Sequence, residues 1–383
     1  MTNWPTKKLG EVCEIISPGI EKFDGVKKYV ATADVDFDKI VNFAEITYKN
    51  RPSRANMEAE ENDVLVARMA ETKKFLIADK NLQDNYIFST GFAVLRVKEE
   101  LIPRYLFYFL TTKDFNLQKD KLAVGATQKA INNSALQKIK ILTPPLNIQQ
   151  KIVERLDAIK KARELNDKQI QLAEELFQSL LHRELDPKGK NWEVKKLGEV
   201  CEMNPKTTLD TKKDKVKYVE MAAIDENLKT IKYLLDRPIN KVSSGAPRFT
   251  NNDIIFARIT PCTENGKIAF VENCKDVCAG STELHILRAK KDKVLPHFLF
   301  YFIITPKIRN MAIASMTGST GRQRVPAEFF HYLKIPLPPL ETQQKIVEKL
   351  SAAQEYKKKL LDQKSKLQEL FESVLNKSLK GQL

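Results

Sequence analysis

The sequence predicts an α/β (α+β) globular domain that is present twice, with a long α-helix after each copy. Two observations predict this fold: an internal repeat with a spacing near 190 residues, and a heptad pattern of apolar residues that closes each copy. The 383 residues suffice for two or more domains, and a hydrophobic share of 42% lets each domain bury a core.

The repeat is clearest where each copy begins. Residues 4–14 read WPTKKLGEVCE and residues 192–202 read WEVKKLGEVCE, so only two of eleven positions differ. Three more pairs of segments match in the same order, and the offset grows from 188 to 194 residues along the chain. These pairs are 63–68 with 253–258, 103–110 with 296–303, and 149–156 with 343–350. A period of this length indicates a duplicated domain rather than a stack of short repeats.

The first part of each copy has a mixed pattern. Short apolar runs rich in strand-forming residues predict strands at 63–67, 92–97, 253–257 and 283–287. The runs Pro103–Leu110 and Pro296–Ile304 begin with proline, which suits a first helical turn, and they predict buried helices. These runs are apolar on nearly every face, which favours their aromatic residues as core rather than as platforms for stacking bases.

The second part of each copy predicts a helix of roughly 35 residues, about 50 Å long. Apolar residues recur in steps of four and three, which is the pattern of a coiled coil. The seam positions are Ile152, Leu156, Ile159, Phe177, Leu180, Ile346, Leu350, Ala353, Phe371 and Val374. Arg163, Asn166, Lys357 and Lys364 interrupt the seam, and polar seam residues fix register and partner choice.

These patterns divide the chain into four parts. The globular domains are expected at 1–145 and 187–339, and the helices at 146–186 and 340–383. The simplest way to bury two equal seams is to pair them. Because module and helix alternate, we expect an antiparallel coiled coil with one module at each end and pseudo-twofold symmetry. The C-terminus near Leu379 would then return close to Met1.

A twofold protein suits duplex DNA, because dimeric readers contact two half-sites about 34 Å apart. The helix pair would then act as a ruler between two half-sites. Lysine and arginine total 64 against 49 acidic residues, which gives a formal charge of +15. This surplus favours nucleic acid, although a generic basic protein has the same balance.

Compartment and redox state follow from what the sequence lacks. No apolar stretch reaches the ~20 residues that cross a bilayer, and the N-terminus has no signal-peptide pattern, so we expect a cytoplasmic protein. Cys13 and Cys201 are equivalent in the repeat, whereas Cys262, Cys274 and Cys278 occur in one copy only. Their spacing does not fit a zinc site, so we expect reduced thiols and no metal.

Three motifs carry a family resemblance. They are the Trp-x-x-Lys-Lys-Leu-Gly-Glu openings at Trp4 and Trp192, the segment 126–129 (ATQK), and the Pro-Pro-Leu-x-x-Gln-Gln-Lys-Ile-Val helix starts from Pro144 and Pro338. With these motifs the chain resembles, over essentially its whole length, the specificity subunit of a type I restriction–modification system.

The resemblance implies two target recognition domains separated by helical spacers. It implies double-stranded DNA as the ligand, read as a bipartite target with a fixed gap. It also implies an assembly with two methyltransferase (modification) subunits and with translocating endonuclease (restriction) subunits. S-adenosylmethionine would bind the methyltransferase and ATP the endonuclease, while this chain itself would bind no cofactor.

The residues agree with a subunit that is not an enzyme. The two Pro-Pro pairs lack the neighbouring Asn or Asp and the aromatic residue that an adenine methyltransferase pocket needs. The sequence has no glycine-rich loop of the dinucleotide or Walker type. We find no carboxylate cluster suited to nuclease metals, and the four histidines have no nucleophile pattern around them.

The two copies share their framework and differ elsewhere. Residues 17–59 hardly resemble 206–249, and residues 69–88 hardly resemble 259–277. We expect the shared parts to build the scaffold and the different parts to read two unlike half-sites of an asymmetric target. The alternative is drift in loops that have no function.

Candidate DNA contacts lie on polar loops and in the variable segments. The loops 125–129 and 318–324 offer Gln, which can contact adenine, and Arg, which can contact guanine or a phosphate; exposed loops without contacts are the alternative. Arg68 and Arg258 end equivalent strands and either face DNA or pair with a core carboxylate. The candidates are Thr127, Gln128, Lys129, Thr320, Arg322, Gln323, Arg324, Arg68, Arg258, Arg51, Arg54, Lys73, Lys74, Arg237, Arg248 and Lys267.

The sequence therefore predicts a DNA sequence-recognition subunit that positions methyltransferase and endonuclease subunits. The alternative is a coiled-coil scaffold that binds only protein partners. Salt distinguishes them, because phosphate contacts make affinity fall by about 0.9 log units per contact for each log unit of salt.

Overall fold

The computed structural model describes residues 4–126, 128–210 and 213–382. The chain forms two compact units. Unit 1 comprises Met1–Asn166 with Gln363–Leu383, and unit 2 comprises Asp167–Asp362. Each unit contains one copy of the repeat and half of each long helix.

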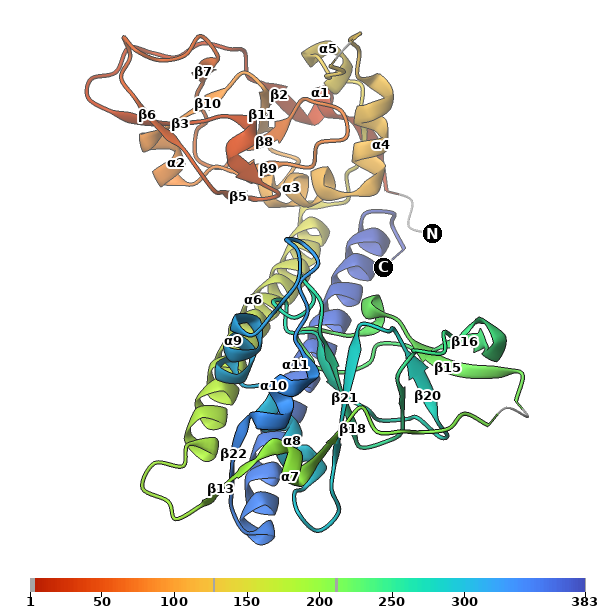
Figure 1. Ribbon diagram of the computed structural model, residues 1–383. Helices are drawn as coiled ribbons and strands as arrows, with labels where there is room; N and C mark the ends of the chain where they lie inside the picture. Colours follow the sequence, from red (N-terminus) through yellow and green to blue (C-terminus); the bar gives the residue numbers. More distant parts are fainter. Residues whose placement is uncertain (1–3, 127, 211–212, 383) are drawn as a thin grey trace. The chain divides into compact units, whose positions relative to one another are not determined.

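The centre of unit 1 is an antiparallel sheet in the order β2-β11-β8-β9 (Figure 1). Its strands are β2 (Cys13–Ile15), β11 (Phe92–Val97), β8 (Val64–Ala67) and β9 (Phe75–Ile77). Alternate residues of β8 enter two different cores: Val64 and Val66 pack with the helices, and Leu65 and Ala67 pack with a second sheet. Burial on both faces explains why β8 is apolar throughout, as the sequence predicts.

The second sheet of unit 1 has the order β6-β3-β10-β7, with β10 parallel to β3. Its strands are β6 (Ala44–Ile46), β3 (Lys27–Val30), β10 (Tyr86–Ser89) and β7 (Ala55–Met57). Two short ladders, β1 (Thr6–Lys8) with β12 (Lys140–Leu142) and β4 (Val35–Asp36) with β5 (Lys39–Ile40), complete the β-structure in the described part of unit 1.

Helices cover the central sheet of unit 1. The predicted buried helix is α3 (Pro103–Thr111), and every residue from Tyr105 to Leu110 is buried. The remaining short helices are α1 (Leu9–Val12), α2 (Lys80–Asn85), α4 (Lys113–Leu122) and α5 (Asn133–Leu136). The aromatic residues of α3 are therefore core residues, as expected from their pattern.

Unit 2 repeats the two four-stranded sheets and the first short ladder of unit 1, while a single bridge between Ile224 and Ile231 stands in place of the β4–β5 ladder. Its central sheet is β14-β21-β18-β19, formed by Cys201–Met203, Leu284–Ala289, Asp253–Ala257 and Ile268–Phe270. Its second sheet is β16-β15-β20-β17, formed by Leu235–Pro238, Lys215–Val219, Cys278–Gly280 and Arg248–Phe249, with β15 parallel to β20. β13 (Glu193–Lys196) pairs with β22 (Lys334–Leu337). The helices are α7 (Leu197–Val200), α8 (Pro296–Ile303), α9 (Pro306–Ala314) and α10 (Ala327–Tyr332).

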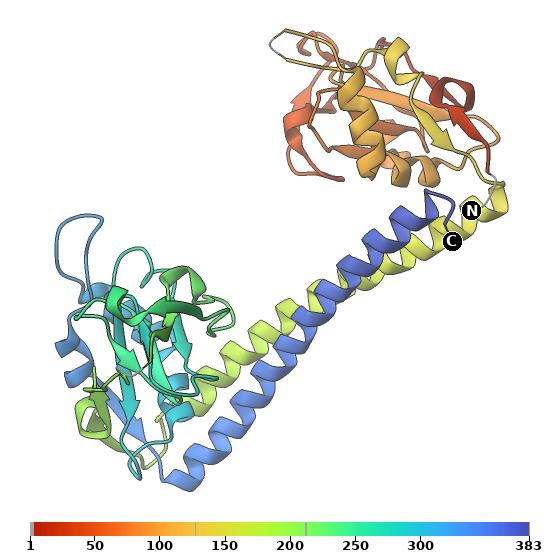
Figure 2. The same ribbon diagram turned by 90° about the vertical axis from the view of Figure 1, so that its right-hand side faces the viewer.

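The two long helices are α6 (Leu146–Leu185) and α11 (Leu340–Ser378). In unit 1, Ile152 and Leu156 near the start of α6 share a core cluster with Leu375 near the end of α11. In unit 2, Phe177 near the end of α6 shares a cluster with Ile346 near the start of α11. Each unit thus joins opposite ends of the two helices, so the pairing is antiparallel, as predicted (Figure 2).

The seam prediction needs correction toward the helix ends. Leu181 and Leu375 are buried, with 2% and 7% of their surfaces exposed, whereas the predicted positions Leu180 and Val374 are only partly buried. A straight α-helix has 3.6 residues per turn, so positions seven residues apart drift around the helix axis by about 20° per heptad. After several heptads the next residue along the chain faces the partner helix and is buried instead.

The repeated Gln-Gln motif at the start of each long helix has a structural role. Gln149 is fully buried; its side-chain oxygen accepts from Ile102 N at 2.9 Å and its amide donates to Glu100 O and Pro144 O. Gln343 makes the equivalent bonds to Leu295 N and Pro338 O. Each glutamine therefore fixes the start of a long helix against the segment before the buried helix.

Two further expectations can be compared with the structure. Cys274 and Cys278 form a disulfide, which corrects the expectation of reduced thiols for this pair. Trp4 and Leu379 pack against the same core cluster of unit 1, so the described ends of the chain meet there; Met1 lies outside the described residues. Among the described residues, no helix is both long and apolar enough to cross a bilayer.

Candidate nucleic-acid interface

The predicted polar loop of unit 1 closes a small ladder. Val124 and Ala130 bridge across its base, and Ala70 N donates to Lys129 O at 2.9 Å. The side chains of Gln128 and Lys129 are exposed on the loop, and Thr127 lies outside the described residues. A side chain at Gly125, where φ is +141°, would place its Cβ 2.2 Å from Gln128 O, so this turn requires glycine.

The loop of unit 2 occupies the equivalent place, which settles the register between the copies. Thr317 and Arg324 bridge across its base, and Thr260 N donates to Gln323 O at 3.1 Å. Arg324 therefore corresponds to Ala130, and Gln323 corresponds to Lys129. The loop of unit 2 is one residue longer, and Thr320 and Arg322 are exposed on it.

Arg68 lies beneath the loop of unit 1 and bonds to backbone carbonyls rather than to a core carboxylate, while its contact with DNA stays a prediction. Its Nε donates to Phe92 O at 3.0 Å, and its Nη1 donates to Ile131 O at 3.4 Å. Burial lowers the pKa of Arg68 from its ordinary value. Both of these partners are backbone carbonyls, so neither of them neutralises the guanidinium as a carboxylate would.

Arg258, the equivalent residue in unit 2, does pair with a carboxylate. Its Nε lies 3.3 Å from Glu283, and Arg324 donates two hydrogen bonds to the same carboxylate at 2.9 and 2.7 Å. These bonds from Arg324 hold the pKa of Glu283 below its ordinary value. Glu283 is only partly buried, so the predicted core carboxylate is instead one at the surface, and it joins Arg258 to the base of the loop.

This cluster has no counterpart in unit 1. Arg68 N donates to Gly91 O just as Arg258 N donates to Glu283 O, so Gly91 corresponds to Glu283. Ala130 corresponds to Arg324, as above. Unit 2 thus carries a matched acid and base at two positions where unit 1 has glycine and alanine.

Other predicted contacts are partly engaged within the protein. The Arg51 guanidinium lies 3.9 Å from the Tyr48 ring centroid, and Arg237 lies 3.5 Å from that of Tyr218 and bonds to Glu220. Arg54 and Lys73 are exposed.

Lys74 and Lys267 form an equivalent pair with a structural contact. Lys74 donates to Thr32 O at 2.6 Å, and Lys267 donates to Met221 O at 2.9 Å. Thr32 and Met221 begin equivalent 3-10 turns, Thr32–Asp34 and Met221–Ala223. The two lysines therefore hold the same turn in both units, a role that their charge alone did not suggest.

Lys119 was missed by sequence reasoning. Its side chain is fully buried and donates to Met69 O at 3.1 Å and to Thr72 O at 2.5 Å. Burial lowers its pKa. Lys119 therefore fixes the segment after β8, on which Lys73 is exposed to solvent. In the sequence, Lys119 looks like any solvent-exposed lysine of an amphipathic helix, so its burial was not predicted.

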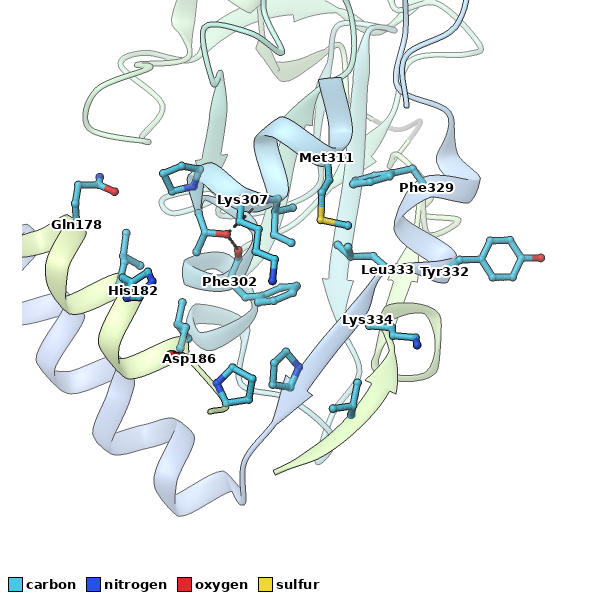
Figure 3. A pocket seen from close by; sticks show the side chains of 18 of the residues that line it. Gln178, His182, Asp186, Phe302, Lys307, Met311, Phe329, Tyr332, Leu333 and Lys334 are labelled. Atoms are coloured by element: carbon cyan, nitrogen blue, oxygen red, sulfur yellow. Dashed lines mark hydrogen bonds between the residues drawn. The ribbon is translucent and has the colours of Figure 1, made fainter. Parts of the chain in front are cut away.

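Unit 2 also contains a large open pocket of a different character (Figure 3). Its volume is about 1080 Å³, and its walls come from the end of α6, from α8 to α10 and from β22. Phe302, Met311 and Leu333 give it an apolar lining, and the charges at its edge are mixed, with Lys307 and Lys334 beside Asp186 and Glu328. Such a lining does not suit phosphate, so we do not assign this pocket to the nucleic-acid interface.

The described residues offer no obvious metal centre: they contain no group of three or more His, Cys, Asp or Glu side chains placed to hold an ion. His285 is fully engaged, since its Nε2 lies 2.8 Å from Val325 O and its Nδ1 lies 3.2 Å from the Asn204 amide. What the two units expose in common is a set of basic and amide side chains around equivalent loops.

Comparison with known proteins gives consistent results. The chain is 32% identical over 157 residues to the EcoAI specificity subunit and 33% identical over 162 residues to the EcoEI specificity subunit, both type I restriction enzyme subunits of Escherichia coli. These matches cover 41% and 42% of this chain but only 27% of each relative, so the chain aligns with about a quarter of their length.

The fold agrees over the full chain. A chain in a structure of the type I R-M system superposes with a TM-score of 0.65 at 20% identity and covers 99% of this chain and 98% of its own length. The family model described as "Type I restriction modification DNA specificity domain" matches residues 1–175 and again residues 189–370. The chain therefore belongs to the family of type I restriction–modification DNA specificity domains, of which it carries two copies.

Proposed function

We propose that this chain is the DNA sequence-recognition subunit of a type I restriction–modification complex, and that each unit reads one half of an asymmetric bipartite target. One observation carries the proposal: equivalent loops on two copies of one fold present different side chains. Gln128 and Lys129 stand in unit 1 where Arg322 and Gln323 stand in unit 2, and only unit 2 has the Glu283–Arg324 pair.

The proposal includes partners and a division of labour. Two methyltransferase subunits would supply S-adenosylmethionine chemistry, and endonuclease subunits would use ATP, while this chain contributes recognition without catalysis in the cytoplasm. The family match and the names of the relatives support this assignment. A scaffold that binds only proteins is not favoured by a family defined by DNA specificity.

The long helices would set the gap between the half-sites. Support comes from the antiparallel pairing within each unit and from the polar positions that interrupt the seam. Lys357 forms an ion pair with Glu174, and Lys349 lies 3.2 Å from Glu184. Such cross-helix pairs fix which residues face each other and thus keep the spacer at one length.

Methylome sequencing of the host, with the gene intact and with it deleted, tests the proposal. The expected result is that deletion removes one bipartite adenine-methylation motif with two unlike halves. An unchanged methylome in a host with active methyltransferase subunits would contradict it. Calorimetric titration of the isolated chain with S-adenosylmethionine is expected to give no binding heat, and a binding isotherm would instead indicate a self-sufficient methyltransferase.

A further inference from the structure

A second pocket of unit 2 differs from the apolar one in every chemical respect. Its volume is about 590 Å³ and it is open to solvent. The residues that line it follow the end of β18, lie at the start of β21, follow β14 and lie before and at the start of β17. The side chains with polar groups in its lining are Asn204, Lys206, Thr207, Thr208, Ser244, Arg248, Arg258 and Thr282.

The charge of this lining is of one sign. Lys206, Arg248 and Arg258 contribute three cations, and no aspartate or glutamate lines the pocket. The hydroxyl groups of its threonines and serine add neutral donors. A lining of cations and hydroxyl donors without a carboxylate suits an anion.

Arg248 indicates that this anion comes from outside the protein. Its Nε is buried and has no hydrogen-bond partner in the described residues, and the Thr207 hydroxyl oxygen shares this condition. Buried polar groups are nearly always hydrogen-bonded. Two such groups without a partner, both on residues that line one pocket, therefore indicate a hydrogen-bonding ligand that is not part of the chain. Arg258, in contrast, is held in place by Glu283.

The pocket is specific to the second copy. Ile16 N donates to Val94 O as Asn204 N donates to Ile286 O, so Lys206 corresponds to Pro18. Glu283, which orients Arg258, corresponds to Gly91. Unit 1 therefore lacks both the cation of Lys206 and the carboxylate that positions the shared arginine.

We propose that this pocket binds a phosphodiester group of the DNA backbone and so anchors unit 2 on the duplex. The inference rests on the proposed function and deepens it, because it assigns Lys206, Arg248 and Arg258 to positioning the unit rather than to reading bases. Phosphate contacts fix register and orientation without carrying sequence information. The bidentate Glu283–Arg324 pair at the adjacent loop is a second feature of this surface that unit 1 lacks.

The test measures binding of the full-length chain to fluorescent duplexes by anisotropy over a range of salt. One duplex carries the methylome-defined target and another a scrambled sequence. Arg248→Ala is expected to weaken binding of both duplexes about tenfold and to reduce the slope of log affinity against log salt by ~1. Lys206→Ala changes an exposed side chain, so the same result from it excludes misfolding as the cause.

Lys291→Ala is the matched control. Lys291 is exposed and follows the far end of β21, roughly 20 Å along the strand from the pocket. This variant is expected to leave the salt slope unchanged. A slope that falls equally in Lys291→Ala and Arg248→Ala would overturn the proposal, because the loss would then reflect total charge.

Three further outcomes separate the alternatives. An unchanged slope in Arg248→Ala and Lys206→Ala overturns the phosphodiester site. Loss of affinity for the target alone, with a relaxed preference at one base, also overturns it and makes Arg248 a base reader. Calorimetric binding of inorganic phosphate at constant ionic strength, without any change in DNA slope, assigns the pocket to a free phosphate instead. If the wild-type chain shows no salt-dependent DNA binding, the proposed function itself fails, and this is seen before any variant is made.

Discussion

Replacing Asp63 with asparagine is expected to destabilise unit 1 by about 3 kcal/mol. Asp63 is 1% exposed, accepts two hydrogen bonds from Arg96 at 2.9 Å each, and accepts a third from Glu60 N at 2.8 Å. Breaking a buried ion pair through one partner costs about 3–5 kcal/mol. Arg96 is 36% exposed and regains some hydrogen bonding from water, which places the expected loss at the lower end.

The duplication supplies a matched experiment in unit 2. Asp253 is equally buried and accepts from Arg288 at 2.7 and 2.6 Å and from Thr250 N at 2.8 Å. Asp253→Asn is expected to cost about the same. Asp84→Asn serves as the control, because its ion pair with Lys80 is exposed and such pairs contribute about 0–1 kcal/mol.

Native-state hydrogen exchange of the full chain assigns each loss to a unit. A loss of about 3 kcal/mol in unit 1 accelerates exchange in β8 and β11 on the order of a hundredfold, while β18 and β21 stay protected. Asp253→Asn is expected to give the reverse. The reasoning is refuted if either variant costs less than about 1 kcal/mol, or if each variant accelerates exchange equally in both units.

Three other perturbations test separate features. Asn166→Leu is expected to raise the urea midpoint of unfolding by an amount equivalent to about 1–3 kcal/mol. The reason is that neither amide atom of this buried side chain has a hydrogen-bond partner in the described residues. A lower midpoint would mean that the amide is hydrogen-bonded after all. Burial lowers the pKa of His285 below its ordinary 6.5, so the unfolded chain takes up the proton first and stability falls as pH drops below about 6.5. Between roughly pH 7.5 and 5.5, the thermal unfolding midpoint of His285→Gln is expected to fall less steeply than that of the unsubstituted chain. Equal falls in the two midpoints would contradict this. Inserting four residues after Asn166 and four at Gln363 lengthens each long helix by ~6 Å. Methylome sequencing should then find the gap between the two half-sites wider by about one or two base pairs. An unchanged gap would contradict the proposal that the helix pair sets the spacing of the half-sites.

The parts of the fold that sequence reasoning predicted are those in which each local pattern has one packing solution. β8 is apolar at every position, and β18 is apolar after its first residue, Asp253, because both faces of the central sheet are covered. The helices α3 and α8, which begin with proline, were predicted for the same reason, since Tyr105–Leu110 and Phe298–Ile303 are buried around the whole helix. The antiparallel helix pair follows from two equal seams and the order of the repeat. In each case the pattern extends over several residues, so single substitutions do not obscure it.

Contacts between side chains from distant segments could not be predicted from the sequence pattern. Glu283 and Arg324 are 41 residues apart and meet only because a loop folds back over the start of β21. Lys119 has the sequence of an exposed helical lysine, and its burial depends on two carbonyl groups about 50 residues earlier. The disulfide of Cys274 and Cys278 likewise depends on the backbone path between them. These contacts are set by tertiary geometry rather than by periodicity.

Several polar contacts are present in both copies. The contacts found in both copies are the Asp–Arg pairs of Asp63 and Asp253, the glutamines Gln149 and Gln343, and the turn-holding lysines Lys74 and Lys267. The aspartates and glutamines among them are buried, so losing a partner there leaves an unsatisfied polar group at a cost of about 1–3 kcal/mol or more. A change at one of these positions therefore weakens the fold.

Some of the contacts found in one copy lie where water can replace a lost partner, unlike the buried Cys274–Cys278 disulfide. Glu283 and Arg324 are partly exposed, and Arg322 is exposed. Exchanging such residues changes the pattern of donors and charges presented to a ligand while costing little stability. One scaffold can therefore present two different surfaces, which is what the proposed recognition of two unlike half-sites requires, through side chains that contribute little to stability.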